Sequence, residues 1–164
     1  MTGGKGRVTP LDAAHAEFIQ GGVSVVVASR NAAFEPDVVR GCGCRVSRDR
    51  RRVTVLIDRA RSDSVLADFA ANGMIAVVYS QPSTHRTIQL KGSDARVVKL
   101  SAADRAIAAR HLRDWSEDLC RIGYTPEFAN AVRGAAPRLA AIAFTPSAAF
   151  QQTPGPGAGK SLVP

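Results

Sequence analysis

Residues 58–64, Asp-Arg-Ala-Arg-Ser-Asp-Ser, bring together two guanidinium groups and two serine hydroxyl groups. The segment follows an apolar run and precedes residues with helical spacing, so the free amides of a helix start lie beside the arginines. Arginine forks, free N–H groups and the positive end of a helix dipole are the components of a phosphate site. The segment therefore predicts a phosphorylated ligand, and the alternative interpretation is a solvated loop with a helix cap.

A second group of polar side chains, at residues 83–86 (Ser-Thr-His-Arg), stands directly before an alternating segment, 87–92. In this segment Ile88 and Leu90 alternate with polar residues, which predicts a strand with one apolar face. Hydrogen-bond donors at the start of a strand can form one edge of a ligand site. For His85 the alternative is a turn histidine that bonds to the backbone.

Two cysteines, Cys42 and Cys44, alternate with Gly41 and Gly43. On a regular strand the two thiols would lie on the same face. A structural zinc site needs about four ligands, but the chain has one further Cys and no His close in sequence. The pattern instead predicts small side chains on a sheet that another group approaches closely.

The overall composition fits one globular domain with a basic surface. The chain has 164 residues, 45% of them hydrophobic, and a formal net charge of +8, which favours anionic partners. The densest basic run, residues 48–52, predicts a solvated hairpin tip, and no aromatic residue interleaves with it, which argues against nucleic-acid binding. Without a segment of about 20 apolar residues or a signal-peptide pattern, we expect a cytoplasmic protein and no membrane span.

The apolar pattern predicts seven short strands and few helices. The strands are expected at residues 23–29, 38–46, 53–57, 74–79, 87–92, 95–100 and 138–144. The helices are expected at about 9–20 and 62–72, in a long segment from 101 to about 122, and from 125. Because most strands follow one another as hairpins, we predict a mainly β (α+β) fold, an antiparallel β-barrel with one long outer helix.

Two of the helix starts carry capping signals: Thr9 followed by Pro10, and Ser101 with Asp104 in the first turn. The long helix has apolar residues at helical spacing, namely Ile107, Ala108, Leu112, Trp115, Leu119 and Ile122. We interpret this stripe as core or subunit interface and not as a cofactor site. His111, beside the stripe, is interpreted as a packed helix histidine.

The composition changes from Pro146 onward. Residues 151–161 are rich in Pro and Gly and cannot bury a core. Their ending, Gly-Lys-Ser, imitates a phosphate-binding P-loop, but Pro154 occupies the position of the first glycine and no strand and helix flank the segment. We therefore divide the chain into an N-terminal segment with a short helix (1–17), a barrel domain (18–145) and a C-terminal tail (146–164).

The order of these elements resembles the pyridoxamine 5′-phosphate oxidase-related family, the FMN-binding split β-barrel proteins of flavin-reductase type. Residues 18–22 before the first strand, the strand–loop–helix unit 53–72 and the strand 84–92 carry the resemblance. It covers about residues 18–100, and the tail at 150–156 is similar to that of some members. The resemblance implies a homodimer with FMN in a groove at the subunit interface, while related branches bind the deazaflavin F420 or haem instead.

The resemblance also implies where the cofactor lies: the ring against strands 40–45 and 53–57, and the phosphate at 59–64. The residues expected to contact the cofactor are Arg40, Val55, Leu56, Ile57, Arg59, Arg61, Ser62, Ser64, His85, Arg86 and Thr87. Arg40 falls where the oxidase has a flavin-contacting Arg. His85 and Arg86 are the candidates for stabilising the reduced flavin anion, and no catalytic residue is identified.

Two departures from the oxidase limit the functional prediction. The Arg-Lys pair of the oxidase falls near Ser64 and Val65, so Arg59 and Arg61 would supply the charge. The pyridoxal-binding residues have no match in the tail, so vitamin B6 activity is not transferred. We expect an FMN-dependent oxidoreductase of unknown substrate and electron donor. The alternatives are a non-catalytic flavin, F420 or haem carrier and, on net charge alone, a basic nucleic-acid-binding barrel.

Overall fold

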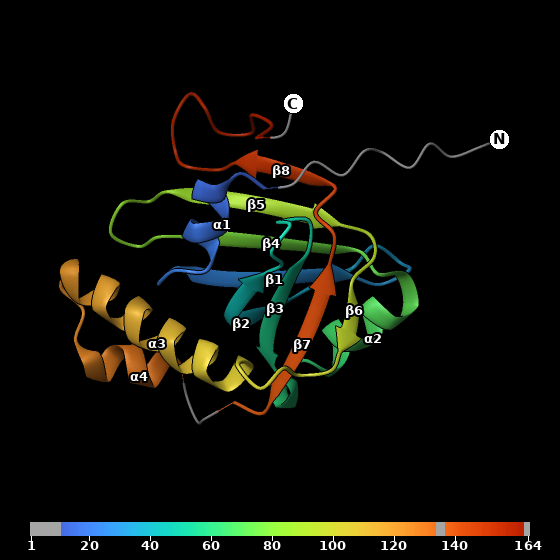
Figure 1. Cartoon of the computed structure of the whole chain (residues 1–164), viewed down its shortest axis with the longest axis horizontal. Coiled ribbons are helices and arrows are strands. Elements are labelled where there is room, and N and C mark those ends of the chain that lie inside the picture. The colour runs from blue at the N-terminus through green and yellow to red at the C-terminus, as the bar shows by residue number, and fades with distance from the viewer. Residues whose placement is uncertain (1–10, 134–136, 163–164) are drawn as a thin grey trace.

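The computed structural model describes residues 11–133 and 137–162, and these contain four α-helices and eight strands (Figure 1). The helices are α1 (Ala13–Ile19), α2 (Asp63–Asn72), α3 (Asp104–Arg121) and α4 (Pro126–Arg133), with a 3₁₀ turn, η1 (Arg59–Arg61). The strands are β1 (Ser24–Arg30), β2 (Pro36–Val46), β3 (Val53–Asp58), β4 (Ile75–Ser80), β5 (Thr87–Gly92), β6 (Arg96–Val98), β7 (Leu139–Phe144) and β8 (Ala148–Gln151). The seven predicted strands are all present.

The strands form one antiparallel sheet in the order β6-β7-β3-β2-β1-β4-β5-β8, in which β6 and β8 are the edges. The first half of β2 pairs with β1 and its second half with β3, and the register shifts between Gly41 and Cys44. A bulge bends and twists a strand, and β1, β4 and β5 accordingly run across the direction of β3 and β7 (Figure 1). The predicted α+β split barrel is confirmed, as an open sheet.

The main core lies inside the folded sheet. Alternate residues of the strands point inward, such as Val25 and Val27 of β1, which are almost fully buried. Helix α1 adds Ile19 to this core and α2 adds Val65 and Phe69. Helix α2 ends at Gly73, whose φ of 67° is the left-handed conformation expected of a helix-terminating glycine. No helix in the two described ranges is long and apolar enough to cross a membrane.

Strand β8 was not predicted, because its residues were assigned to the tail. It is short, and only Ala149 is buried, so its alternating pattern is weak. Its pairing with β5, continued by the bond from Gln152 N–H to Thr87 O (2.8 Å), is what orders it. An edge strand held by its partner leaves little signal in its own sequence.

The helix caps differ from the prediction. The predicted cap Thr9 and the following Pro10 lie outside the described residues, and α1 is capped by Asp12, which accepts a hydrogen bond from His15 N–H (2.6 Å). The predicted cap Ser101 was wrong, because α3 begins at Asp104. Its buried carboxylate accepts the N–H of Ser101 (2.8 Å) and pairs with Arg45 (2.8 Å), so this ion pair fixes the helix start.

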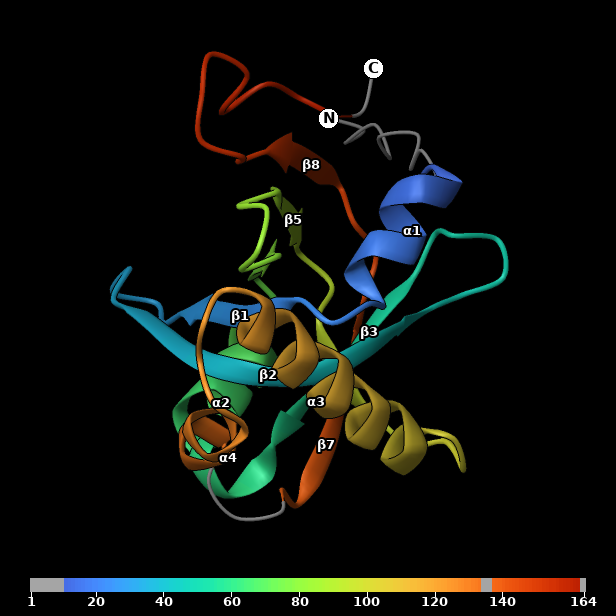
Figure 2. The ribbon, with the colours of Figure 1, turned by 90° about the vertical axis from the view of Figure 1, so that its left-hand side faces the viewer.

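Helix α3 packs across β2 (Figure 2), and glycines permit the contact. A Cβ added at Gly43, where φ is 121°, would lie 3.1 Å from His111 Cβ. The close approach predicted for this part of β2 is thus made by α3. The two thiols do not share a face as expected, because the bulge turns Cys44 into the core, where Sγ bonds Ile19 O (3.0 Å), while Cys42 faces α3.

Candidate functional site

A cavity of about 840 Å³ lies between β2 and the helix pair α3–α4. Its walls come from residues 38–42 of β2, the end of β3 with η1, one face of α3, and the chain leading into β7. The apolar part of the lining includes Val38, Leu112 and Trp115. This volume lies within the range of about 300–1,000 Å³ that is usual for small-molecule sites.

The charged groups of the cavity are mostly arginines. They are Arg40, Arg61, Arg105 and Arg138, from four separate segments. Among the described lining residues the one acid is Asp58, and its carboxylate is already engaged. Asp58 Oδ1 accepts the Ala60 (3.2 Å) and Arg138 (3.1 Å) amides, and Oδ2 lies 3.9 Å from Arg61 Nε. The cavity therefore carries surplus positive charge and favours an anionic ligand.

Two titratable groups in the cavity are uncharged at neutral pH. Burial, reinforced by the nearby Asp58 carboxylate, raises the pKa of the Cys42 thiol to about 11. Burial lowers the pKa of His111, and the Gly21 carbonyl and Asp114 oppose this effect only in part. A protonated thiol is a poor nucleophile, so Cys42 contributes shape and weak polarity to the lining.

The buried histidine makes the stability pH-dependent. Since the pKa of His111 lies below its ordinary 6.5 in the folded chain, the unfolded state binds more protons between these two values. This stability is fully present above about pH 6.5 and is lost as the pH falls toward the folded pKa. Urea unfolding between about pH 7.5 and pH 5.5 should show this decline. His111→Gln should flatten it, and an equal decline in that variant would assign it to another group.

The predicted phosphate segment is only partly in the cavity. Arg61 and, from β2, Arg40 line it, whereas Arg59 is exposed outside the lining. Ser62 is buried, and its hydroxyl donates to Asp58 O (2.6 Å). The Ser64 hydroxyl donates to the Asp37 carboxylate. Both hydroxyls are therefore used within the protein at the start of α2.

The β3 residues expected against the flavin ring, Val55, Leu56 and Ile57, are fully buried, with no exposed surface. β3 lies between β2 and β7 in the sheet, and Val55 and Ile57 belong to the main core. The contribution of β3 to the cavity is therefore its last residue, Asp58, whereas Val55, Leu56 and Ile57 do not line the cavity.

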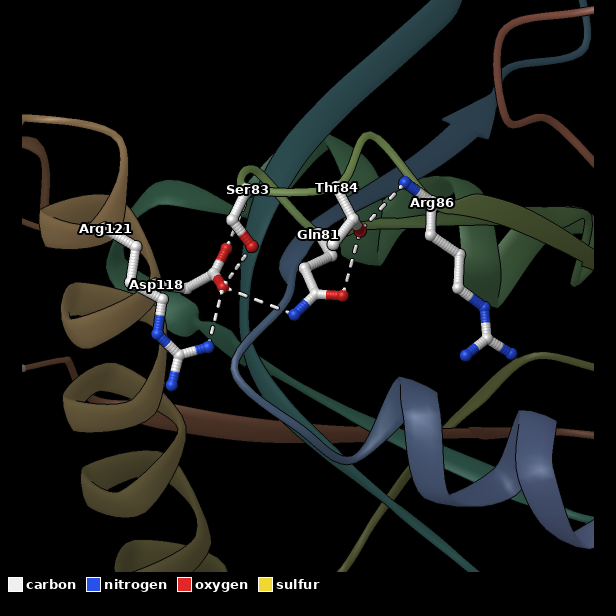
Figure 3. Close-up of polar contacts among 6 residues, drawn as sticks. All are labelled: Gln81, Ser83, Thr84, Arg86, Asp118 and Arg121. Carbon is white, nitrogen blue, oxygen red and sulfur yellow. Dashed lines mark hydrogen bonds and ion pairs between the residues drawn. The ribbon is translucent and has the colours of Figure 1, made fainter.

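The loop between β4 and β5 is fixed to α3 by one buried carboxylate, that of Asp118 (Figure 3). Asp118 accepts hydrogen bonds from Ser83 N–H (2.9 Å), the Ser83 hydroxyl (2.6 Å) and Gln81 Nε2 (3.2 Å). Its Oδ1 atom also lies 3.5 Å from Nη1 of Arg121, whose side chain is exposed. The two donors of Ser83 thus hold the loop against α3 at Asp118, one helical turn after Trp115.

The other residues of this loop also have partners in the chain. His85 is exposed in a turn with φ of 59°, and its N–H bonds Gln81 O (2.9 Å). The Arg86 guanidinium lies 4.2 Å from the centre of the Phe18 ring. Thr87 shares a hydrogen bond with Ser80 (2.7 Å). The described lining of the cavity includes none of the predicted residues 85–87.

Sequence reasoning missed the α3 wall of the cavity. Trp115 and His111 were assigned to packing, and both are buried, but both also line the cavity. Trp115 and Leu119 pack against Ala129 of α4 in a second, smaller core. The sequence places Arg105 on the same helix as the apolar stripe, but this does not reveal which face of the helix meets β2.

No protein-family model and no curated protein matches the sequence. Solved structures do match. HupZ from Group A Streptococcus is 14% identical with a TM-score of 0.55, covering 92% of this chain and 98% of its own. A predicted pyridoxamine 5′-phosphate oxidase from Lactobacillus delbrueckii is 13% identical (TM-score 0.52, 86% and 93% covered). An F420 reductase is 12% identical (0.51, 85% and 98%). The resemblance predicted from the sequence is confirmed at the level of the fold.

Proposed function

We propose that this protein is an FMN-binding homodimer and a flavin-dependent oxidoreductase, with its cofactor in the cavity between β2 and α3. The observation that carries the proposal is the surplus of arginines in a cavity of cofactor size, whose single described acid is already engaged. The shared fold supports it, because two of the proteins with this fold are named for oxidase and F420 reductase activities. The substrate and the electron donor are not assigned.

The residues present suit a phosphorylated flavin. Arg61 and Arg138 would hold the phosphate, since Asp58 ties the Arg61 side chain and the Arg138 backbone to one carboxylate. The apolar lining would take the ring. When bound, a flavin supplies hydride and electron transfer. The chain binds and orients it, and the Arg40 guanidinium favours an anionic form of the ligand.

A homodimer is supported by the outer face of the sheet beside the cavity. Val26 is 37% exposed and Val38 62% exposed. Val26 pairs with Val78 of β4, and Val38 pairs with Ala28 of β1, so these apolar side chains form a continuous surface across three strands. Since Val38 also lines the cavity, a second copy placed on this face would enclose the ligand further.

The absorption spectrum of the purified protein, before and after FMN is added, tests the proposal. We expect flavin bands that remain with the protein on gel filtration, at the elution volume of a dimer. Bleaching by NAD(P)H and reoxidation by oxygen would separate an enzyme from a flavin carrier. Binding of F420 in preference to FMN, or a Soret band from haem, would reassign the cofactor. A colourless protein that takes up no FMN contradicts the proposal.

The two arginines of η1 offer a matched pair of variants. Arg61→Ala should weaken FMN binding by about 10- to 100-fold, since a hydrogen bond to a charged group is worth about 1.5–3 kcal/mol. Arg59→Ala, on the same turn but outside the cavity, should change affinity by about twofold at most. Fluorescence titration with FMN and with riboflavin, which lacks the phosphate, measures both. Equal losses in the two variants would move the phosphate to the outer side of the helix start.

A further inference from the structure

The indole N–H of Trp115 is a buried donor whose partner is missing. Trp115 is only 7% exposed, and its Nε1 atom makes no hydrogen bond with any described residue. Most buried N–H groups in proteins are paired, because an unmade hydrogen bond under burial costs free energy. Trp115 also lines the cavity, so a group bound in the cavity can supply the acceptor.

A second donor, the Arg40 guanidinium, stands beside this indole. Its Cζ atom lies 5.6 Å from the centre of the Trp115 ring, within the range of a cation–π contact. Its hydrogen bond within the described chain is one long contact from Nη1 to the Ser24 hydroxyl (3.3 Å). A guanidinium has five N–H donors, so Arg40 keeps donors available to a ligand.

No carboxylate neutralises this pair within the described lining. Asp58 is the one acid there, and it contacts Arg61 and the backbone of η1 and of Arg138 rather than Arg40. The two donors come from different elements, β2 and α3, and the Asp118 contacts hold α3 in place one turn further on. A preformed cation next to a dry N–H donor is suited to an oxyanion.

We infer that Arg40 and Trp115 form a two-donor subsite for an oxyanion, a carboxylate or phosphate group, of a ligand held in the cavity. The inference deepens the proposed function, because the oxyanion belongs either to the cofactor or to a separate anionic substrate. Arg61 and Arg138 provide a separate cationic site for the cofactor phosphate. The arrangement therefore favours an anionic substrate as the molecule that carries the oxyanion.

The only tryptophan of the chain is Trp115, so intrinsic fluorescence reports directly on this subsite. We expect pyrophosphate or succinate, added to the full-length protein at constant ionic strength, to change the emission saturably, while sodium chloride does not. Arg40→Gln should weaken that binding by about tenfold or more. Arg113→Gln, an exposed arginine on the same helix, is the charge-matched control and should bind as the wild type does.

Trp115→Phe keeps an aromatic ring but removes the donor, and calorimetry replaces fluorescence for this variant. The affinity for the same anions should fall by about 3- to 10-fold, with an unchanged melting profile as the check on folding. Calorimetry on FMN-loaded protein separates the two sources. Anion binding that persists with FMN present assigns the subsite to a substrate, and binding that FMN abolishes assigns it to the cofactor.

The inference is overturned if neither anion gives a saturable response, or if Arg40→Gln and Trp115→Phe both bind anions as the wild type does. Failure of the inference is distinguishable from failure of the proposed function. FMN uptake without anion binding leaves the proposed function standing. Anion binding without FMN uptake leaves the subsite standing and removes the flavin.

Discussion

Replacing Gly22 by alanine is expected to lower the free energy of unfolding by about 3 kcal/mol, at the upper end of usual overpacking costs. The added Cβ would lie 2.4 Å from the Asp114 carbonyl carbon and 2.8 Å from the Trp115 amide nitrogen. Both are backbone atoms of α3, so no side-chain rotation can relieve the contact. The helix must move away from the segment between α1 and β1 that contains Gly22, and the cavity wall formed by α3 moves with it.

Urea denaturation at constant pH measures this effect, and Gly157→Ala is the matched control. A Cβ at Gly157 would meet no atom within 4 Å, so that variant should stay within about 0.5 kcal/mol of the wild type. If Gly22→Ala unfolds at the same urea concentration as the wild type, α3 does not pack at this distance. The cavity wall formed by α3 would then lie further from the segment between α1 and β1.

The second large effect is expected for Asp118→Asn, which should also destabilise the chain by about 3 kcal/mol. The carboxylate accepts two hydrogen bonds from Ser83 and one from Gln81 in a buried position. An amide has one oxygen for these donors, and its NH₂ group would face a donor instead of an acceptor. The pair with Arg121 adds little, because that side chain is 67% exposed.

Glu117→Gln provides the control for Asp118→Asn, since it removes a charge from an exposed position on the same helix. It should change the free energy of unfolding by about 0.5 kcal/mol or less. Hydrogen exchange at the Ser83 amide is the local measurement, and it should accelerate strongly only in Asp118→Asn. Equal stability of the two variants would contradict the role of Asp118 in fixing the loop.

The local elements of this fold could be predicted from sequence because their causes are local. The β-branched run at 23–29 has no competing helical pattern, and Gly73 ends α2 by the conformation that only glycine adopts cheaply. Asp104 was located at the start of α3, but its partner Arg45 is 59 residues away and could not be seen. The cap predicted at Ser101 was therefore wrong, because a side chain distant in the sequence helps to fix the start of this helix.

The site was predicted less well because it depends on how elements meet. Arg61 was found because its segment combines arginines with a helix start, and Arg40 was found through the family resemblance. The position of Trp115 in the cavity lining was not predicted. Apolar residues at helical spacing occur both in a helix that packs on a core and in one that borders a cavity. The polar residues at 83–86 suggested a ligand, whereas Asp118 supplies the partner of Ser83.

The pairing of β8 with β5 has a consequence for how copies of the chain behave toward one another. β5 alternates Ile88 and Leu90 with polar residues, and a free edge of this kind is a template for intermolecular strand addition and aggregation. β8 occupies that edge, and the following segment returns over β8 through a bridge between Phe150 and Ser161. The C-terminal part of the described chain thus shields the β5 edge from strand addition by another copy.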